Sequence, residues 1–130
     1  MKDDIEKVED TVRTYVEGVV NFEFEKGESA WHPDGLKIGI DTENHSLTRS
    51  TISETRPDLS PDQIEDMKQR VSQKGTIVAS KVSGHIAHVE LLWHYKRDRE
   101  EIEITDFILL QKIMGDWKIV AKVHDARTKR

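Results

Sequence analysis

The sequence predicts an α+β fold, with N-terminal helices packed on the concave face of a curved antiparallel β-sheet. Residues 102–123 form two expected strands joined by a turn at Met114 and Gly115, because glycine supplies the positive φ that a two-residue hairpin loop needs. Residues 4–24 carry apolar side chains at helical spacing. Helical segments come first and long strands last, a segregation that is typical of α+β domains.

The composition indicates a small globular protein, and we expect one domain over residues 1–130. Of the 130 residues, 35% are hydrophobic and 35% charged, which suits one sizeable core under a wet surface. A formal net charge of −5 argues against nucleic acid as a partner, and the basic end at residues 127–130 is expected to be frayed. The absence of cysteine excludes disulfides and thiolate sites.

The sequence also argues against a membrane partner. No apolar run reaches the ~20 residues of a membrane span. Residues 1–6 do not have the pattern of a signal peptide. We therefore expect a cytoplasmic protein.

The first helix is predicted over residues 4–24, with Asp3 as its N-cap. Gly27 is expected to end it. Residues 28–32 can add one short turn, which Pro33 stops because the residue before proline avoids the α region.

The middle of the chain is predicted as a strand pair and a helix. Residues 36–40 alternate apolar and polar side chains, residues 42–46 form a turn, and residues 47–52 form a short return strand. Residues 60–63 start the next helix with a serine cap, a proline at the first helical position and a glutamine that can reach back. We expect Gly75 to end this helix.

Two long strands follow at residues 76–83 and 86–95, around a turn at Gly84 and His85. The more apolar of their two faces is expected to point inward. That face carries Val78, Ser80, Val82, Ala87, Val89, Leu91 and Trp93.

The closing hairpin has one almost wholly apolar face, which is expected to meet the core. It carries Ile104, Asp106, Ile108, Leu110, Trp117, Ile119, Ala121 and Val123, and the opposite face includes Lys118, Lys122 and His124. Asp106 is the polar exception. A carboxylate in such a row must be hydrogen-bonded, neutral, or directed at a cavity. A curved sheet covered by a helix is not filled completely at its open end, so we expect a pocket there.

Three segments resemble the nuclear transport factor 2-like superfamily, in the branch labelled lumazine-binding or polyketide-cyclase-like. They are residues 12–18 (VRTYVEG), residues 32–34 (HPD), and residues 105–107 (TDF) with residues 115–120 (GDWKIV). The resemblance implies a cone-shaped, cystatin-like roll, a pocket between helix and sheet, and frequent homodimers. Members of that superfamily include isomerases, dehydratases, cyclases and proteins without known activity. The lumazine label does not establish a ligand for this chain.

Asp106 and His32 are the candidate catalytic residues. A desolvated carboxylate has a raised pKa, as a general base beside a carbonyl requires. His32, expected at the mouth of the cone, could complete a proton-transferring dyad. Alternatively, Asp106 bonds a backbone amide or a tyrosine of the first helix, and His32 caps a helical turn. If Asp106 is a base, Asp106→Asn should abolish turnover with little loss of folding.

Five aromatic residues are candidates for a ligand-binding lining: Tyr15, Trp31, Trp93, Tyr95 and Trp117. Core packing explains such residues equally well. Histidines on the outer strand face do not supply a complete set of metal ligands, so no metal is predicted, and no cofactor fingerprint is present.

The leading hypothesis is a homodimer that binds a small organic molecule in its pocket. The alternatives are a cofactor-free isomerase, dehydratase or cyclase that uses Asp106, and an interaction module without a working pocket. The dimer is predicted to form through the outer sheet face, because a monomer rarely exposes a large apolar patch. This outer face carries Ile77, Leu92, Phe107, Leu109, Ile113 and Val120.

Overall fold

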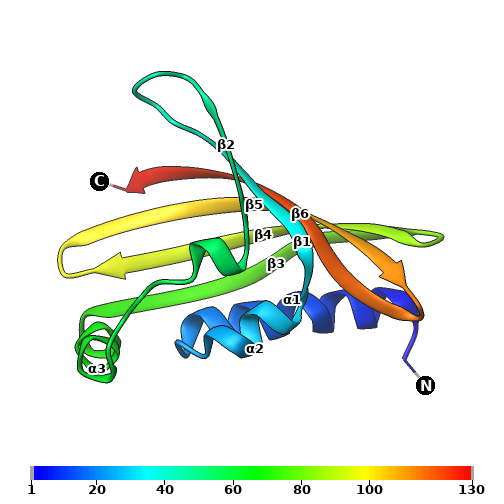
Figure 1. Ribbon diagram of the computed structural model, residues 1–130, viewed down its shortest axis with the longest axis horizontal. Helices are drawn as coiled ribbons and strands as arrows, with labels where there is room; N and C mark the ends of the chain where they lie inside the picture. Colours follow the sequence, from blue (N-terminus) through cyan, green and yellow to red (C-terminus); the bar gives the residue numbers. More distant parts are fainter. Residues whose placement is uncertain (1, 130) are drawn as a thin grey trace.

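The computed structural model describes residues 2–129, with side chains over residues 2–128. Its elements are α1 (Asp4–Val20), α2 (Phe24–Ser29), β1 (Trp31–Ile40), β2 (Leu47–Thr51), the 3-10 turn η1 (Ser53–Thr55), α3 (Pro61–Arg70), β3 (Val71–Ser83), β4 (Ile86–Arg97), β5 (Glu100–Ile113) and β6 (Asp116–Lys129). The strands form one six-stranded sheet. The sheet curves over α1 and α2, which lie together on one of its faces (Figure 1). The predicted α+β arrangement is therefore confirmed.

The strand order is β2-β1-β6-β5-β4-β3. All neighbouring strands pair antiparallel except β1 and β6, which run parallel. This parallel pair joins the first strand of the chain to the last, one strand in from the β2 edge of the sheet (Figure 1). As a result, residues from the first and last thirds of the chain share one inner face.

Both predicted long hairpins are present. Met114 and Gly115 form the β5–β6 turn with φ values of 51° and 88°, and Ile113 pairs with Asp116 as expected. Gly84 takes a φ of 60° in the β3–β4 turn. These turns are predictable because they depend on local residue chemistry alone.

The first helix is shorter than the periodicity predicts. α1 ends at Val20, and Phe22 adopts a φ of 56°, a left-handed conformation that cannot continue an α-helix. The chain then turns and forms α2 over Phe24–Ser29. Gly27 lies inside α2 rather than ending the first helix.

α3 (Pro61–Arg70) begins after Ser60 as predicted but ends earlier than predicted. Ser60 accepts a hydrogen bond from the Gln63 backbone, and the Gln63 side chain accepts one from the Ser60 backbone. The helix stops at Arg70 instead of Gly75, because Val71 already pairs with Arg97 of β4. Pairing along the whole of β3 outweighs the helical pattern of this short segment.

Two β-bulges place some side chains on the opposite face from the one predicted. In β3 the register shifts between Ile77 and Ala79, which leaves Val78 54% exposed and packs Ile77 against the core. In β6, Ile119 pairs with Leu110 but Ala121 pairs with Leu109, so Val120 is the extra residue. Beyond the β3 bulge, Ser80 and Val82 face inward as predicted. In β6 the side chains after Val120 lie on the face opposite to the predicted one.

The core lies between α1 and the inner sheet face. It contains Val8, Val12, Tyr15, Ala30, Trp31, Ala87, Val89, Leu91, Trp93, Ile108, Leu110, Trp117 and Ile119. The expectation of a frayed basic end is wrong over residues 127–129, which continue β6 and pair with β5; residue 130 lies outside the described residues. Within residues 2–129, no helix is long and apolar enough to cross a membrane.

Candidate functional site

A completely buried carboxylate lies on the inner face of the sheet. Asp106 is 0% exposed, as its place in the apolar row predicts. Its Oδ2 accepts a hydrogen bond from Trp93 Nε1 at 2.8 Å. Its Oδ1 is buried and has no hydrogen-bond partner among the described residues. Such an atom is costly to leave unpaired unless something outside the chain supplies a donor.

Lys122 is the cationic partner of Asp106. Its Nζ lies 3.3 Å from Asp106 Oδ2, and Lys122 is only 8% exposed. The alternation of β6 predicts that Lys122 points outward, and that expectation is wrong because of the Val120 bulge. The same bulge turns His124 inward and moves Ala121 and Val123 to the outer face, where Val123 is 48% exposed.

Tyr15 completes this buried cluster from α1. Its hydroxyl oxygen accepts a hydrogen bond from Lys122 Nζ at 3.2 Å. Burial raises the pKa of Tyr15, so its hydroxyl stays protonated at neutral pH. Burial alone would lower the pKa of Lys122, but Tyr15 and Asp106 outweigh it and the pKa of Lys122 is raised. Asp106 and Lys122 therefore form a charged pair beside a neutral phenol.

Lys37 and His124 stand next to this cluster. Lys37 pairs in register with Lys122 across the parallel strands, which places the two side chains on the same face. His124 lies over Gly39, where an added Cβ would be 3.0 Å from its Cε1 atom. Gly39 therefore leaves the room that the imidazole occupies. Burial and the Lys122 charge lower the pKa of His124 below its ordinary value of 6.5.

Two adjoining hollows open between the helices and the sheet. The first, which we name the ion-pair hollow, has a volume of about 370 Å³ and is lined by Tyr15, Val19, Lys37, Gln73, Trp93, Tyr95, Ile104, Asp106, Lys122 and His124. The second, the apolar hollow, has a volume of about 290 Å³. It shares Tyr15, Val19, Lys37, Gln73 and Tyr95 with the first and extends to α2, η1 and α3.

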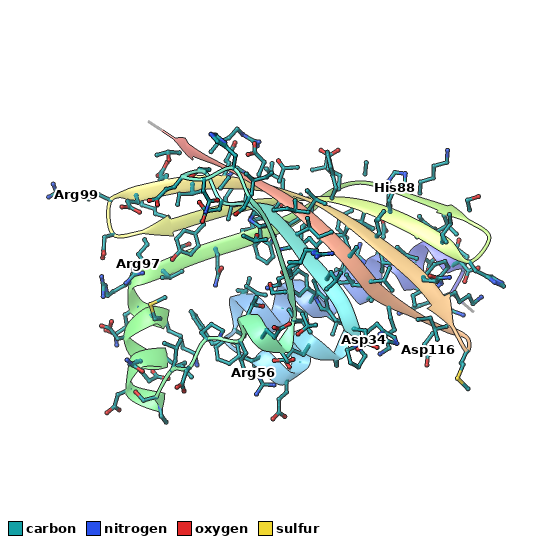
Figure 2. The ribbon with its side chains drawn as sticks, turned by 45° about the horizontal axis from the view of Figure 1, so that its top comes forward. Asp34, Arg56, His88, Arg97, Arg99 and Asp116 are labelled. Carbon is teal, nitrogen blue, oxygen red and sulfur yellow. The ribbon has the colours of Figure 1, made fainter. Side chains whose placement is uncertain are left out.

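Arg56 and Glu28, two charged side chains that line the apolar hollow, are paired with each other. Arg56, which follows η1, donates to the Glu28 carboxylate on α2. Figure 2 shows Arg56 on the helix side of the sheet, next to α2. Lys37 is the cation that both hollows share.

The structure brings together three of the five aromatic candidates. Tyr15, Trp93 and Tyr95 line the ion-pair hollow. Trp31 packs edge-on against Tyr15, with ring centroids 5.6 Å apart, but lines neither hollow. Trp117 is buried at the far end of α1, where its Nε1 donates to Asp4. Trp31 and Trp117 are therefore core residues.

The structure does not bring His32 to Asp106. His32, Pro33, Asp34 and Gly35 form an irregular loop-out of β1, between the pairing of Trp31 with Ile119 and of Leu36 with Ala121. The His32 Nδ1 accepts a hydrogen bond from the Asp34 backbone at 3.0 Å. Asp34 lies at the end of β1 nearest the helices (Figure 2). A dyad of His32 with Asp106 is therefore not formed.

Within the described residues, no group of three His, Cys, Asp or Glu side chains is arranged to hold a metal ion. The polar groups that converge are Asp106, Lys122, Lys37, His124 and Tyr15. Such a set can hydrogen-bond and charge-pair with a ligand at one end, while the apolar hollow accommodates its hydrophobic part.

Comparisons with known proteins agree with this fold. A family model described as "Putative lumazine-binding" matches residues 3–125. No curated protein matches the sequence at a significant level.

Solved structures with the same fold are numerous. An NTF2-like (nuclear transport factor 2-like) protein of unknown function from Shewanella baltica is similar with a TM-score of 0.76 and 18% identity, covering 99% of this chain and 100% of that one. A ketosteroid isomerase-like protein from Erwinia carotovora atroseptica is similar with a TM-score of 0.69 and 11% identity, covering 99% of this chain and 100% of that one. A domain of unknown function with a cystatin-like fold from Nostoc punctiforme has a TM-score of 0.71 and 9% identity, covering 99% of this chain and 81% of that one. These low identities establish the fold alone.

Proposed function

The chain belongs to the family described as "Putative lumazine-binding", and from that premise we propose that its two adjoining hollows bind a small, partly apolar organic molecule. The observation that carries the proposal is the lining of the ion-pair hollow, where Lys37, Lys122 and His124 stand among aromatic and aliphatic side chains. A polar group of the ligand would bind to these cationic and imidazole groups. The aromatic and aliphatic lining on either side would cover the remainder of such a ligand.

A bulkier side chain on the wall that the two hollows share should weaken binding. Val19 lines both hollows, so we expect Val19→Trp to occupy their volume. The neutral fluorescent probe N-phenyl-1-naphthylamine should bind the unmodified protein, and its affinity should fall at least about tenfold in Val19→Trp, which corresponds to about 1.4 kcal/mol. Fluorescence titration measures both dissociation constants.

The matched control is Val78→Trp. Val78 is 54% exposed at the β3 bulge and lines neither hollow. Its replacement should leave probe affinity unchanged. Equal loss in both variants, or no probe binding by the unmodified protein, would contradict the proposed function.

Catalysis is the second candidate. Asp106 lines the ion-pair hollow, and a group that accepts a substrate proton must lie within reach of the substrate. However, Oδ2 is held by Trp93 and by Lys122, and His32 is absent from the site. These contacts favour a carboxylate that organises the hollow, so we place binding ahead of an isomerase, dehydratase or cyclase reaction.

The third hypothesis, an interaction module without a working pocket, fits these hollows poorly. A closed and wholly apolar interior would favour it. Here, two lysines, one carboxylate and one imidazole line the ion-pair hollow. Asp106 and Lys122 are both buried, and ionisable groups are rarely buried together without a function or a strong structural reason.

We also propose that the chain forms a homodimer through the outer sheet face. Exposed apolar side chains gather there, with Phe107 58%, Leu109 50% and Val123 48% exposed. Phe107 pairs with Val123 and Leu109 with Ala121 across β5 and β6, so they form one continuous patch. A patch of this kind is typical of a protein–protein interface.

A charge in this patch should dissociate the dimer. We expect the unmodified protein to sediment at twice the monomer mass and Phe107→Glu to sediment as a monomer, because the interface would bury the carboxylate without a partner. Analytical ultracentrifugation measures both masses. Met114→Glu is the control, since Met114 is 99% exposed in the β5–β6 turn and away from the patch. A monomeric unmodified protein would contradict the dimer.

A further inference from the structure

The ion-pair hollow contains more cationic than anionic groups. Lys37 and Lys122 both line it, whereas Asp106 is its one carboxylate among the described residues. Asp106 Oδ2 is already paired with Lys122 at 3.3 Å. The Lys37 charge is therefore left without an anion in this hollow.

Lys37 has no internal partner that would explain its position. Its ammonium makes no hydrogen bond or ion pair with any residue between 2 and 128, whereas Glu28, across the apolar hollow, is bound by Arg56. Cross-strand pairing keeps Lys37 beside Lys122, and like charges at paired positions destabilise a sheet. An unpartnered, half-buried cation beside a second cation indicates a place for an anionic group.

We propose that the ligand of these hollows carries one acid group, such as a carboxylate or sulfonate, and that the Lys37 ammonium pairs with it. This inference rests on the proposed function. The acid group would lie beside Lys37, within reach of the Tyr15 hydroxyl and His124, and the apolar part of the ligand would extend toward α2. The ligand class is thus a small hydrophobic acid.

The charges that face Lys37 allow a test by pH. They are Lys122 and His124 on β6, Asp106 on β5, Glu28 on α2 and Arg56 after η1, with the phenols of Tyr15 and Tyr95. Burial and the Lys122 charge lower the pKa of Lys37 to about 8. The lowered pKa of His124 and the raised pKa values of Tyr15 and Lys122 place their titrations outside pH 7–9. Lys37 is thus the group expected to lose its charge in this interval.

The experiment compares two probes that share one ring system. 8-Anilinonaphthalene-1-sulfonate is anionic, and N-phenyl-1-naphthylamine lacks the sulfonate. Lys37→Met should weaken binding of the sulfonate about tenfold, the value of a partly desolvated charged hydrogen bond. It should change binding of the neutral probe less than twofold. Lys74→Met, at an exposed position on β3 that lines neither hollow, controls for net charge and should change neither affinity.

Measuring the sulfonate affinity as a function of pH distinguishes an effect of the Lys37 charge from a merely structural role of Lys37. Affinity for the sulfonate should fall between pH 7 and pH 9 in the unmodified protein, because Lys37 loses its proton and the sulfonate does not titrate there. Lys37→Arg should bind the sulfonate with no such decline, since arginine keeps its charge.

Two results would overturn the inference while the hollows still bind: an unchanged sulfonate affinity in Lys37→Met, or an equal loss for both probes. Failure of the unmodified protein to bind the neutral probe overturns the proposed function itself. The inference would then fall with it.

Discussion

Asp106→Ala is expected to lower the free energy of unfolding by about 3–5 kcal/mol, the cost of breaking a buried ion pair on one side. Lys122 is only 8% exposed, and its Nζ would lose the carboxylate oxygen that now lies 3.3 Å from it. Trp93 would also lose the acceptor for its Nε1. Asp106→Asn should also lower the free energy of unfolding, because an amide does not neutralise the charge of Lys122. That result would be the opposite of what a free-standing general base predicts.

Urea unfolding at pH 7 measures this loss, and a double variant tests its cause. Asp106→Leu combined with Lys122→Met removes both charges, so it should recover most of the stability lost by either single change. Asp66→Ala is the surface control. It breaks the exposed pair of Asp66 with Arg70 and should cost far less than Asp106→Ala. A double variant no more stable than Asp106→Ala would show that packing, rather than charge, explains the loss.

The pH dependence of this pair follows from Lys122. Its pKa is raised in the folded protein, because Tyr15 and Asp106 outweigh the effect of burial. A raised lysine pKa contributes stability below the unfolded value of 10.5 and loses it as pH rises through the folded value. The pair should therefore be intact across neutral pH, and its contribution should disappear only in strongly alkaline solution.

The parts of the fold that depend on local chemistry were predictable. The Met114–Gly115 turn fixes the register of β5 against β6 near the turn, and Ser60 with Gln63 fixes the start of α3. Asp106 was identified because the alternation of β5 is regular from Ile104 to Leu110. These features need only the residue and its immediate neighbours.

The other half of the site could not be predicted, because it depends on an insertion in a ladder. The Val120 bulge reverses the side of the sheet that Lys122 and His124 occupy. A run of apolar residues around a lysine has the same pattern with or without a bulge, so the sequence has no signal for it. Lys37 was missed for a related reason. Its neighbour Lys122 is known only once β1 is seen to run parallel to β6.

The contact of α1 with α2 should be the second most sensitive point, and Gly18→Ala is expected to cost about 3 kcal/mol. A Cβ at Gly18 would lie 2.5 Å from Gly27 Cα and 2.9 Å from the Glu23 carbonyl oxygen. These are backbone atoms, so no side-chain rotation relieves the overlap and the helices must separate. The gain of about 1 kcal/mol from replacing glycine inside a helix does not offset this.

Gly27→Ala is the matched control, because the contact is asymmetric. A Cβ at Gly27 would lie 3.6 Å from Gly18 Cα, an ordinary contact distance. We expect that variant to be at least as stable as the unmodified protein in thermal and urea unfolding, because it removes a glycine from the interior of α2 without an overlap. Both glycines line the apolar hollow, so separation of the helices in Gly18→Ala should also widen it and weaken binding of N-phenyl-1-naphthylamine. Equal stability of the two variants would mean that α2 moves freely, and that the apolar hollow has no fixed shape for a ligand to recognise.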